Sequence, residues 1–395
     1  MRLNFDLRVI GIVVAIGCGS IVLMSASTEA PRANGAAPAA AQVTPTPCAS
    51  PNPVSKFASN PAVIQVDTIY DIFAVGDAHA DPGRLAGVLV KAGIIGAVPA
   101  TPSAVIWTAG QSVMVVTGDM IDKGPNSLGV IALLRALQTA AAAQRGQVII
   151  TMGNHEAEFL ADPHGKKTSE FQAELKKAGL KRNDVASCQG DLGVFLCGLP
   201  IAARVNDWFF SHAGNTNGQS IAGLNAAIAS GICQNGFSTA QLQDGNSILE
   251  ARLNDKGPNN LPWFDNGSPT ANPQTLLQSY VTALGGVNHL IQGHQPGNVA
   301  FPDGVQRNQY DLFQRYGLLF LIDGGMSQGI SGNKSIGGAL HITRSGNQGA
   351  TIQTVTAICA GGQTTVLWDS QTNQPGPIAL DCPSPTPTPT PSKKK

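Results

Sequence analysis

Short apolar runs alternate with longer stretches of mixed apolar and polar residues through the middle of the chain. The short runs are rich in Val, Ile and Phe and end at glycine or polar residues, as strands of a buried sheet do. We predict strands at 70–75, 113–117, 147–152, 207–211, 289–292, 318–322 and 339–343, and helices at 127–143, 169–178, 220–230 and 274–284. This alternation predicts an α/β domain over residues 63–358.

The two ends of the chain differ in composition from this domain. Residues 1–30 hold Arg2 and Arg8 before an apolar run, which predicts a signal peptide or an uncleaved N-terminal anchor. The length of the run fits both interpretations, and both stay open. Residues 31–62 form an Ala/Pro-rich linker, and residues 359–395 form a C-terminal extension with a Pro/Thr-rich tail. We therefore expect an exported protein, periplasmic or extracellular, with a membrane anchor if the leader is retained.

Charge is sparse and balanced along the chain. Charged residues make up 13% of the sequence, and 25 Lys and Arg residues are matched by 25 Asp and Glu residues. No global field draws such a chain to nucleic acid, so we expect no nucleic-acid partner. An anionic ligand would have to be bound by a local site.

Six cysteines lie outside the leader, and an even number in an exported chain suggests disulfide bonds. Cys188 with Cys197, and Cys359 with Cys382, are the pairs we expect, because the loops between them are short. None of the six has CxxC spacing, so a cysteine zinc site is not predicted.

Polar side chains follow five of the predicted strands. Taken one at a time they have ordinary structural explanations, such as a helix cap, a turn or a buried histidine. Together they supply the carboxylate, amide and imidazole ligands that two adjacent divalent metal ions need, at the strand ends where α/β sheets place ligand sites. The groups are Asp77 with His79, Asp119 with Asp122, Asn154 with His155 and Glu156, His212, and His294.

This series resembles the calcineurin-like metallophosphoesterases, in their phosphoprotein-phosphatase branch. The family pattern GDxHG, GDxxDRG, GNHE, HGG and GHTP is matched in order by GDAHA, GDMIDKGP, GNHE, HAGN and GHQP. The segments GDMIDKGPNSLGV, FLCGLPIAARVNDWFFSHAG, NNLPWFD and LIDGGMSQGI are most similar to the bacterial Shewanella-like phosphatases, a group that includes protein tyrosine phosphatases. The resemblance implies the fold of the family, a central β-sandwich of two mixed sheets flanked by helices.

The resemblance also implies a pair of divalent metal ions, which could be Mn, Fe or Zn. A hydroxide between the two ions would attack phosphorus in a phosphomonoester. One ion would be held by Asp77 and His79, the other by Asn154, His212 and His294, and Asp119 would bridge them.

Three further residues take roles from the same resemblance. His155 would be a general acid that protonates the leaving oxygen, and Asp122 would hold and charge its imidazole. Lys123 would face the phosphate beside His155. The implied substrate is a phosphoprotein, phosphotyrosine included, or a small phosphomonoester.

Two departures from the family pattern concern the grip on phosphate. Lys123 stands where the family has an arginine, and Asp265 stands where a second arginine is expected. Lysine offers a point charge in place of a planar fork, and an aspartate would repel phosphate. Either the grip is weakened, or another basic residue such as Arg84, Arg204 or Arg252 supplies it.

Two alternatives remain open from the sequence. The same metals would serve a phosphodiesterase or a diadenosine polyphosphate hydrolase, and a chain that lost efficient chemistry would be a metal-dependent phosphate-binding module. The sequence leaves the oligomeric state open.

Overall fold

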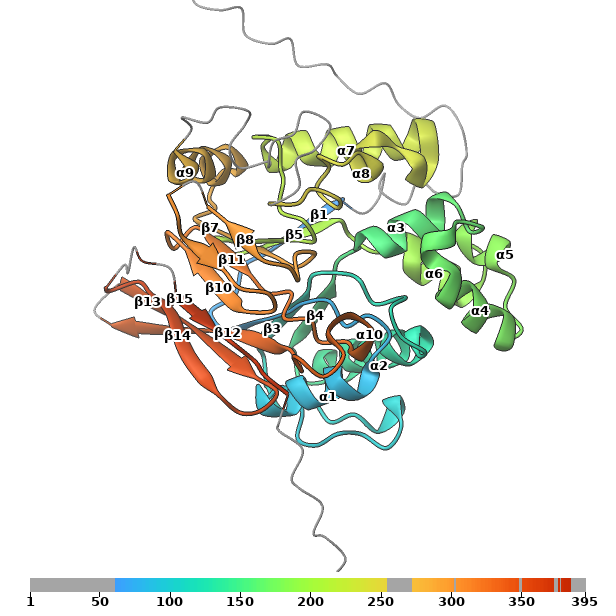
Figure 1. Cartoon of the computed structure of the whole chain (residues 1–395), viewed down its shortest axis with the longest axis horizontal. Coiled ribbons are helices and arrows are strands. Elements are labelled where there is room, and N and C mark those ends of the chain that lie inside the picture. The colour runs from blue at the N-terminus through green and yellow to red at the C-terminus, as the bar shows by residue number, and fades with distance from the viewer. Residues whose placement is uncertain are drawn as a thin grey trace, which may run out of the picture. The chain divides into compact units, whose positions relative to one another are not determined.

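Two large β-sheets pack face to face in the computed structural model (Figure 1). The structure describes residues 61–253, 272–301, 303–347, 350–372, 376 and 378–384. The predicted leader, nearly all of the predicted linker, Asp265 and the Pro/Thr-rich tail lie outside these residues. No helix within the described ranges is long and apolar enough to span a membrane.

The first sheet has six strands in the order β14-β13-β12-β2-β3-β4. The central strands β2, β3 and β4 run parallel, and β12 pairs antiparallel with β2. The long hairpin of β12 and β13 and the following β14 extend this sheet on the other side. The strand bounds are Ile72–Val75 (β2), Val113–Val116 (β3), Gln147–Ile150 (β4), Gly338–Asn347 (β12), Ala350–Cys359 (β13) and Thr364–Asp369 (β14).

The second sheet has seven strands in the order β1-β5-β6-β7-β11-β10-β15. It is mixed as well: β6, β7 and β11 run parallel, while β5 and β10 run antiparallel to their inner neighbours. A separate two-stranded sheet joins β8 and β9. The strand bounds are Val63–Val66 (β1), Ala202–Val205 (β5), Trp208–Ser211 (β6), His289–Gln292 (β7), Val299–Ala300 (β8), Gln306–Arg307 (β9), Leu312–Arg315 (β10), Leu319–Leu321 (β11) and Ile378–Leu380 (β15).

Helices cover the outer faces of both sheets. Helices α1 and α2 pack on the six-stranded sheet, α7 and α9 lie over the seven-stranded sheet, and α3 to α6 cluster beside the sandwich (Figure 1). The helix bounds are Pro82–Lys91 (α1), Ser127–Ala142 (α2), Asn154–Ala161 (α3), Ser169–Lys177 (α4), Arg182–Ala186 (α5), Gly190–Cys197 (α6), Ile221–Asn235 (α7), Ala240–Gln243 (α8), Pro273–Leu284 (α9) and Gln328–Ser331 (α10), with 3₁₀ turns at Pro102–Ala104 (η2), Lys166–Thr168 (η3) and Gly236–Ser238 (η4).

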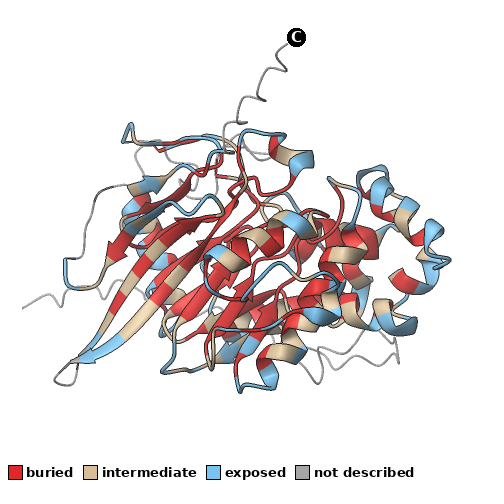
Figure 2. Ribbon diagram, turned by 90° about the horizontal axis from the view of Figure 1, so that it is seen from below, coloured by how far each residue is buried: buried red, intermediate tan, exposed pale blue. Residues whose placement is uncertain are grey.

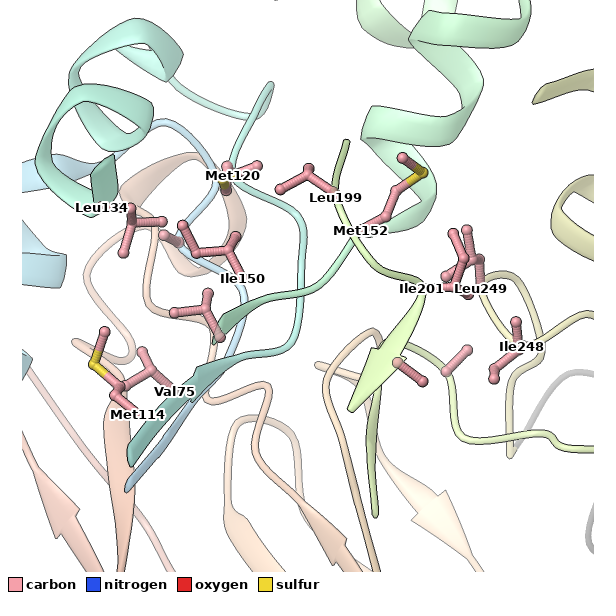
Figure 3. Packing of buried hydrophobic residues seen from close by; sticks show 14 of the residues in the cluster. Val75, Met114, Met120, Leu134, Ile150, Met152, Leu199, Ile201, Ile248 and Leu249 are labelled. Atoms are coloured by element: carbon pink, nitrogen blue, oxygen red, sulfur yellow. The ribbon is translucent and has the colours of Figure 1, made fainter. Parts of the chain in front are cut away.

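The central strands are apolar at every position because both of their faces are buried (Figure 2). Successive side chains of a strand point to opposite faces. On β2, Ile72 and Ala74 therefore face the core between the sheets, while Phe73 and Val75 belong to the core that includes the helices. Figure 3 shows part of this second core, where Met114 and Ile150 lie near Leu134 of α2.

The structure contains a strand or a helix at each predicted position, with ends that differ by a few residues. The predicted α/β sandwich of two mixed sheets with flanking helices is confirmed. Both sheets continue beyond residue 358, the predicted end of the domain. Strand β14 extends the first sheet and β15 pairs with β10 in the second, because the 359–384 segment folds back onto the sandwich.

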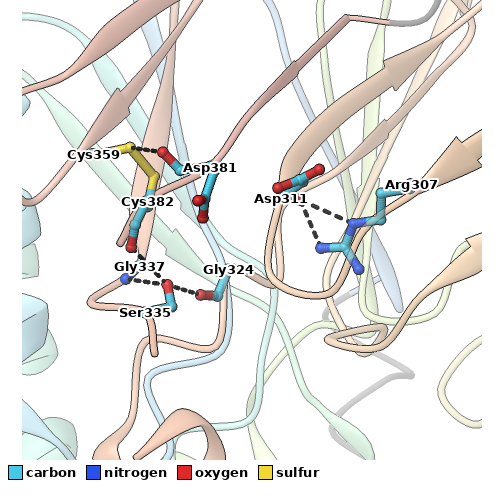
Figure 4. The surroundings of a disulfide bond; sticks show 8 residues. All are labelled: Arg307, Asp311, Gly324, Ser335, Gly337, Cys359, Asp381 and Cys382. Atoms are coloured by element: carbon cyan, nitrogen blue, oxygen red, sulfur yellow. Dashed lines mark hydrogen bonds between the residues drawn. A yellow bond between two sulfur atoms is a disulfide. The ribbon is translucent and has the colours of Figure 1, made fainter. Parts of the chain in front are cut away.

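Both expected disulfide bonds, Cys188–Cys197 and Cys359–Cys382, are present. The second joins the end of β13 to the segment after β15 (Figure 4). Ser335 lies beside it, and its single hydroxyl hydrogen lies between the carbonyl oxygens of Gly324 and Cys382, at 2.6 and 3.0 Å from Oγ. The disulfide and Ser335 therefore hold the C-terminal segment against the sheets.

Candidate metal centre

The predicted polar residues come together at one edge of the two sheets, at the carboxyl ends of five strands. Three groups follow β2, β3 and β4 of the six-stranded sheet, and two follow β6 and β7 of the seven-stranded sheet. Strand ends at such an edge are the usual location of ligand sites in α/β proteins. Each of these residues was predicted to follow a strand, and the order of the strands in the two sheets brings them close together.

The backbone at this edge is unusually constrained. Five of the predicted site residues have φ between 36° and 59°, in the left-handed region that side chains other than glycine rarely adopt. Such conformations cost about 1–3 kcal/mol each and persist where the surroundings impose them, often at functional sites. The five are His79, Asp119, Asp122, Lys123 and His294.

Glu156 stabilises the loop that carries Asp119. Its buried carboxylate accepts hydrogen bonds from the backbone N–H groups of Asp119, Met120, Ile121 and Gly153, at 2.8–3.1 Å. Burial, followed by the charge of Asp119, raises the pKa of Glu156 to about 7. No role for Glu156 was predicted from the sequence, although a glutamate three residues after a helix N-cap is the signal of a capping box.

Gly153 permits the close approach of this loop to α3. A Cβ at Gly153 would lie 2.2 Å from both the backbone nitrogen and Oδ1 of Asp119. Any side chain here would push the Asp119 loop away from α3. The glycine before Asn154 is therefore required by the packing of two site segments against each other.

Three histidines are oriented by main-chain carbonyls. Nδ1 of His79 donates to the carbonyl of Ile121 at 3.1 Å, and Nδ1 of His212 donates to that of Thr117 at 2.8 Å. His294 uses Nε2 in the same way toward the carbonyl of Glu250, at 3.2 Å. A ring nitrogen that donates to a carbonyl fixes the tautomer and leaves the other nitrogen unprotonated in the neutral ring, ready to ligate a metal.

The remaining ring nitrogens converge on Asp119. Its Oδ2 lies 3.3 Å from Nε2 of His79 and 3.4 Å from Nε2 of His212. Nε2 of His212 also lies 3.0 Å from Nδ1 of His294 and 3.1 Å from Oδ1 of Asn154. Asp119 thus stands between His79 on one side and His212 and His294 on the other, as a bridging ligand would.

Two overlapping groups of ligand atoms result, each with all atoms within 4.8 Å of one another. His79, Asp119 and His155 form one, and Asp119, His212 and His294 form the other. Asp119 belongs to both. His155, predicted as the acid, lies in the first group, whereas Asp77, predicted as a ligand, lies outside both.

The protonation of each of these groups depends on the charges of the others. Burial disfavours the protonated form of His212, but the carboxylates of Asp119 and Asp77 outweigh it and raise the pKa of His212 to about 10. Burial also opposes the charged form of Asp119, yet the nearby imidazoles, His212 first, hold the pKa of Asp119 well below its usual range. The carboxylates therefore favour positive charge at this position.

The donor set fits divalent metal ions. Oδ2 of Asp77 accepts from the backbone N–H of His294 at 2.9 Å, but Oδ1 of Asp77 is buried with no hydrogen-bond partner in the described parts of the chain. A buried carboxylate oxygen is costly unless it is paired, and a cation would satisfy it. Imidazole, carboxylate and amide ligands together suit Mn, Fe or Zn.

His155 and Asp122 form the predicted pair beside the ligands. Nδ1 of His155 lies 3.3 Å from Oδ2 of Asp122, and the other oxygen of Asp122 accepts from the backbone N–H of Phe171 at 2.9 Å. Burial lowers the pKa of His155, but the charges of Asp119 and Asp122 outweigh it and raise that pKa above its ordinary value. The pair therefore keeps the imidazole protonated to higher pH, beside the candidate metal ligands.

The basic residues that could grip a phosphate are not equivalent. Arg84 donates to the main-chain carbonyls of Met326, Gly332 and Ser335, so its guanidinium serves the structure. Arg204 lies on β5 and pairs with Asp67, away from the site. Arg252 donates to the carbonyl of His294 at 2.9 Å, and the exposed Lys123 follows Asp122 directly. Of these four residues, Arg252 and Lys123 are thus the ones beside the predicted ligands.

A buried arginine, Arg307, supports the loop of His294. It donates to the carbonyl of Asp311 (Figure 4) and also to those of Gln295, Gly297 and Asp323. Burial lowers the pKa of Arg307 to about 10. This arginine links the loops after β7 and β11 through main-chain carbonyls.

Comparisons with known proteins agree with this geometry. The family model of the calcineurin-like phosphoesterases matches residues 70–315. Uncharacterized protein C1840.07c of Schizosaccharomyces pombe is 35% identical over 85 residues, and Shewanella-like protein phosphatase 2 of Arabidopsis thaliana is 31% identical over 85 residues. These matches cover 22% of this chain and only 24% and 20% of those relatives. They support the predicted resemblance to the Shewanella-like phosphatases.

Solved structures show the same fold. A cold-active protein tyrosine phosphatase aligns with a TM-score of 0.58 and 19% identity, over 79% of this chain and 84% of that one. A cold-active protein-tyrosine phosphatase of a psychrophilic Shewanella species aligns with a TM-score of 0.54 and 18% identity, over 78% and 84%. Because the family model covers more than half of the sequence and its ligand residues meet at one sheet edge, the chain belongs to the calcineurin-like phosphoesterase family.

Proposed function

We propose that the protein is an exported, metal-dependent phosphomonoesterase that uses two divalent ions, which could be Mn, Fe or Zn. The observation that carries this proposal is the orientation of His79, His212 and His294. Each donates one ring nitrogen to a main-chain carbonyl and presents the other near Asp119 or His212. Histidines held in this way are built to ligate metals.

The chain's own residues divide the remaining work. Two divalent ions, when bound, would supply an acidified water and neutralise charge on the phosphoryl oxygens. Asp119 provides a carboxylate that both ions can share. His155, held through Nδ1 by Asp122, donates the proton of Nε2 to the ester oxygen as its bond to phosphorus breaks. Lys123 and Arg252 would hold the phosphoryl oxygens.

The proposed substrate is a phosphoprotein, phosphotyrosine included, or a small phosphomonoester. Support comes from the relatives, one named as a protein phosphatase and others as protein tyrosine phosphatases. A general acid beside the ligands suits poor leaving groups such as the alkoxide of serine. The two positive charges of Lys123 and Arg252 would match the two negative charges of a phosphomonoester.

A paired assay tests the proposal. The purified chain is loaded with Mn²⁺ and given p-nitrophenyl phosphate and, separately, bis-p-nitrophenyl phosphate, with and without a chelator. We expect turnover of the monoester that the chelator abolishes. Faster turnover of the diester would favour a phosphodiesterase. Metal binding without turnover of either ester would indicate a binding module.

Export is part of the proposal and has separate support. The N-terminal pattern of Arg2 and Arg8 before an apolar run is that of a leader, and two disulfide bonds suit an oxidising compartment. A reporter that is active only outside the cytoplasm should work when fused after residue 60. A reporter that stays inactive there, together with six titratable thiols in the native protein, would contradict export.

A further inference from the structure

Glu250 touches the metal centre without belonging to the set of predicted ligands. Both of its carboxylate oxygens accept from Nδ2 of Asn154, at 3.1 and 3.2 Å. The side chain is 17% exposed, and Asn154 is buried. Glu250 lies 96 residues from Asn154 in the chain, so only the tertiary fold brings the two together.

This contact settles which way the amide of Asn154 points. A reversed amide would place its oxygen against the two oxygens of Glu250, which in the ionised side chain offer no hydrogen and would repel it. The nitrogen therefore faces Glu250, and Oδ1 faces Nε2 of His212 at 3.1 Å. Only the oxygen of an amide has a lone pair to offer a metal.

The same residue also orients His294, through its main chain. The carbonyl of Glu250 lies 3.2 Å from Nε2 of His294, which leaves Nδ1 of that ring facing His212. The side chain and the carbonyl of one residue thus act on two of the three ligands predicted for the same ion.

Glu250 is itself held in position. Its backbone N–H donates to Oγ of Ser247 at 3.1 Å. Nζ of Lys167, in η3, lies 3.7 Å from Oε1 of Glu250 and pairs with Glu158 of α3. Lys167 therefore places a positive charge next to both glutamates, beside Asn154.

We infer that Glu250 is a positioning residue that presents the amide oxygen of Asn154 to the ion shared with His212 and His294. The inference rests on the proposed function in that it takes Asn154 as a metal ligand. Groups that orient metal ligands typically contribute 10–100-fold to metal affinity. Loss of Glu250 should therefore weaken the binding of this ion and spare the binding of the other, which His79 and Asp77 are predicted to hold.

Mn²⁺ titration of the metal-free chain, followed by calorimetry, tests the inference by a readout other than activity. In Glu250→Ala, one of two sites should bind about 10–100-fold more weakly, and the other should be unchanged. Glu250→Gln keeps an oxygen that can accept from Asn154 and should recover most of the affinity. Glu250→Asp keeps the charge but is too short to reach, and should behave like Glu250→Ala while retaining the fold.

Asp207 offers a matched control. Its Oδ2 accepts from Nδ2 of Asn288 at 3.1 Å, and its side chain is 23% exposed, but it precedes β6 whereas His212 follows it. Asp207→Ala removes the same kind of contact at the opposite end of the strand and should leave both affinities unchanged.

Three results would overturn the inference. They are wild-type affinity for both ions in Glu250→Ala or Glu250→Asp, an equal loss in Asp207→Ala, or no recovery in Glu250→Gln. A wild-type chain that binds no Mn²⁺ would overturn the proposed function itself, and the inference with it. If the wild-type chain binds two ions and is active, and Glu250→Ala binds both ions with wild-type affinity, the inference is overturned but the proposed function is not.

Discussion

The two sides of the metal centre differ in what holds their residues in place. His79 and His212 donate to the carbonyls of Ile121 and Thr117, which flank Asp119 in one loop, whereas Asn154 and His155 are held by the carboxylates of Glu250 and Asp122. A carbonyl anchor survives any change of the side chain that bears it, but a carboxylate anchor is lost with one substitution. Outside the predicted ligands, substitutions should therefore affect metal binding and activity most at Glu250, at Asp122 and at Glu156, which supports the Asp119 loop.

The largest effect is expected where the two sides meet, at Asp119. Asp119→Asn replaces the shared carboxylate by a neutral amide, which cannot offset two adjacent dications. Several kcal/mol of transition-state stabilisation should be lost, so turnover should fall by roughly 10³-fold or more. The variant should also bind less metal. Metal analysis and steady-state rates check this. A variant with two ions and near-normal rates would rule out a bridging role.

The next largest effect concerns His155, on the carboxylate-held side. His155→Ala should keep the metals and lose the proton donor, which lowers turnover by about 10²–10⁴-fold for alkyl phosphates. p-Nitrophenyl phosphate should suffer less, because p-nitrophenolate leaves without a proton. Rates for both esters and metal content are the measurements. Equal losses for the two esters, or loss of metal, would argue that His155 is a ligand.

Glu156 tests the side of the metal centre whose histidines are anchored by main-chain carbonyls, because it holds the backbone of that loop. Glu156→Ala leaves four backbone N–H groups of the Asp119 loop and Gly153 without their acceptor. At about 1–3 kcal/mol for each buried unpaired donor, the free energy of unfolding should fall by at least about 3 kcal/mol even if water reaches some of them. Chemical denaturation measures this.

Glu174 provides the comparison for Glu156. Its carboxylate accepts from the backbone N–H groups of Ser127 and Leu128 and from Oγ of Ser127, at the start of α2. Glu174→Ala should also lower stability, but the folded variant should keep its metals. Folded Glu156→Ala should lose metal affinity as well. Equal metal binding by the two variants would show that Glu156 has no special role at the site.

The pH dependence should report on the Asp122 carboxylate. Because the pKa of His155 is raised, the imidazole stays protonated to higher pH, and activity that needs this proton is lost only as pH rises through that raised pKa. Asp122→Asn removes one of the charges that raise it, so the basic limb of the pH–rate profile should move to lower pH. An alkyl phosphate is the substrate of choice. A basic limb that does not move would show that Asp122 does not control the pKa of the proton donor.

The smallest effect is expected at the exposed Lys123. Lys123→Met should raise the Michaelis constant for a phosphomonoester by about tenfold, the low end of the roughly 1.5–3 kcal/mol that a charge-assisted hydrogen bond contributes, because Lys123 is exposed and Arg252 remains. Lys123→Arg should lower the constant if the family's arginine grips better here. A Michaelis constant that neither change moves would mean that Lys123 does not contact the phosphate.

The candidate ligands could be predicted from the sequence because each follows a strand that can be recognised. Runs such as VMVV of β3 are apolar throughout, and the polar group after each run stands out against a chain with few charges. Helix α1 was missed although Asp81 and Pro82 form a readable start signal, with the Asp81 side chain accepting from the backbone N–H of Arg84. Strand β10 was missed because Gln314 and Arg315 break its apolar pattern.

The supporting residues could not be predicted in the same way. Glu250 follows a segment without periodicity, and its partner Asn154 is set by the packing of α3 against the α7–α8 region. Arg252 was one of three candidate cations, and only contacts in the folded chain distinguish it: Arg252 donates to the carbonyl of His294, whereas Arg84 and Arg204 are engaged elsewhere. Ligands carry a local signal, whereas the groups that aim them depend on contacts between distant segments.

The central claim is that two divalent ions act together at this sheet edge. The most direct test is a stepwise Mn²⁺ titration of the metal-free chain, with p-nitrophenyl phosphate turnover measured at each step. The claim predicts binding of two equivalents per chain, with turnover rising mainly as the second is bound. Saturation of turnover at one equivalent, or turnover that persists in excess chelator, would contradict it.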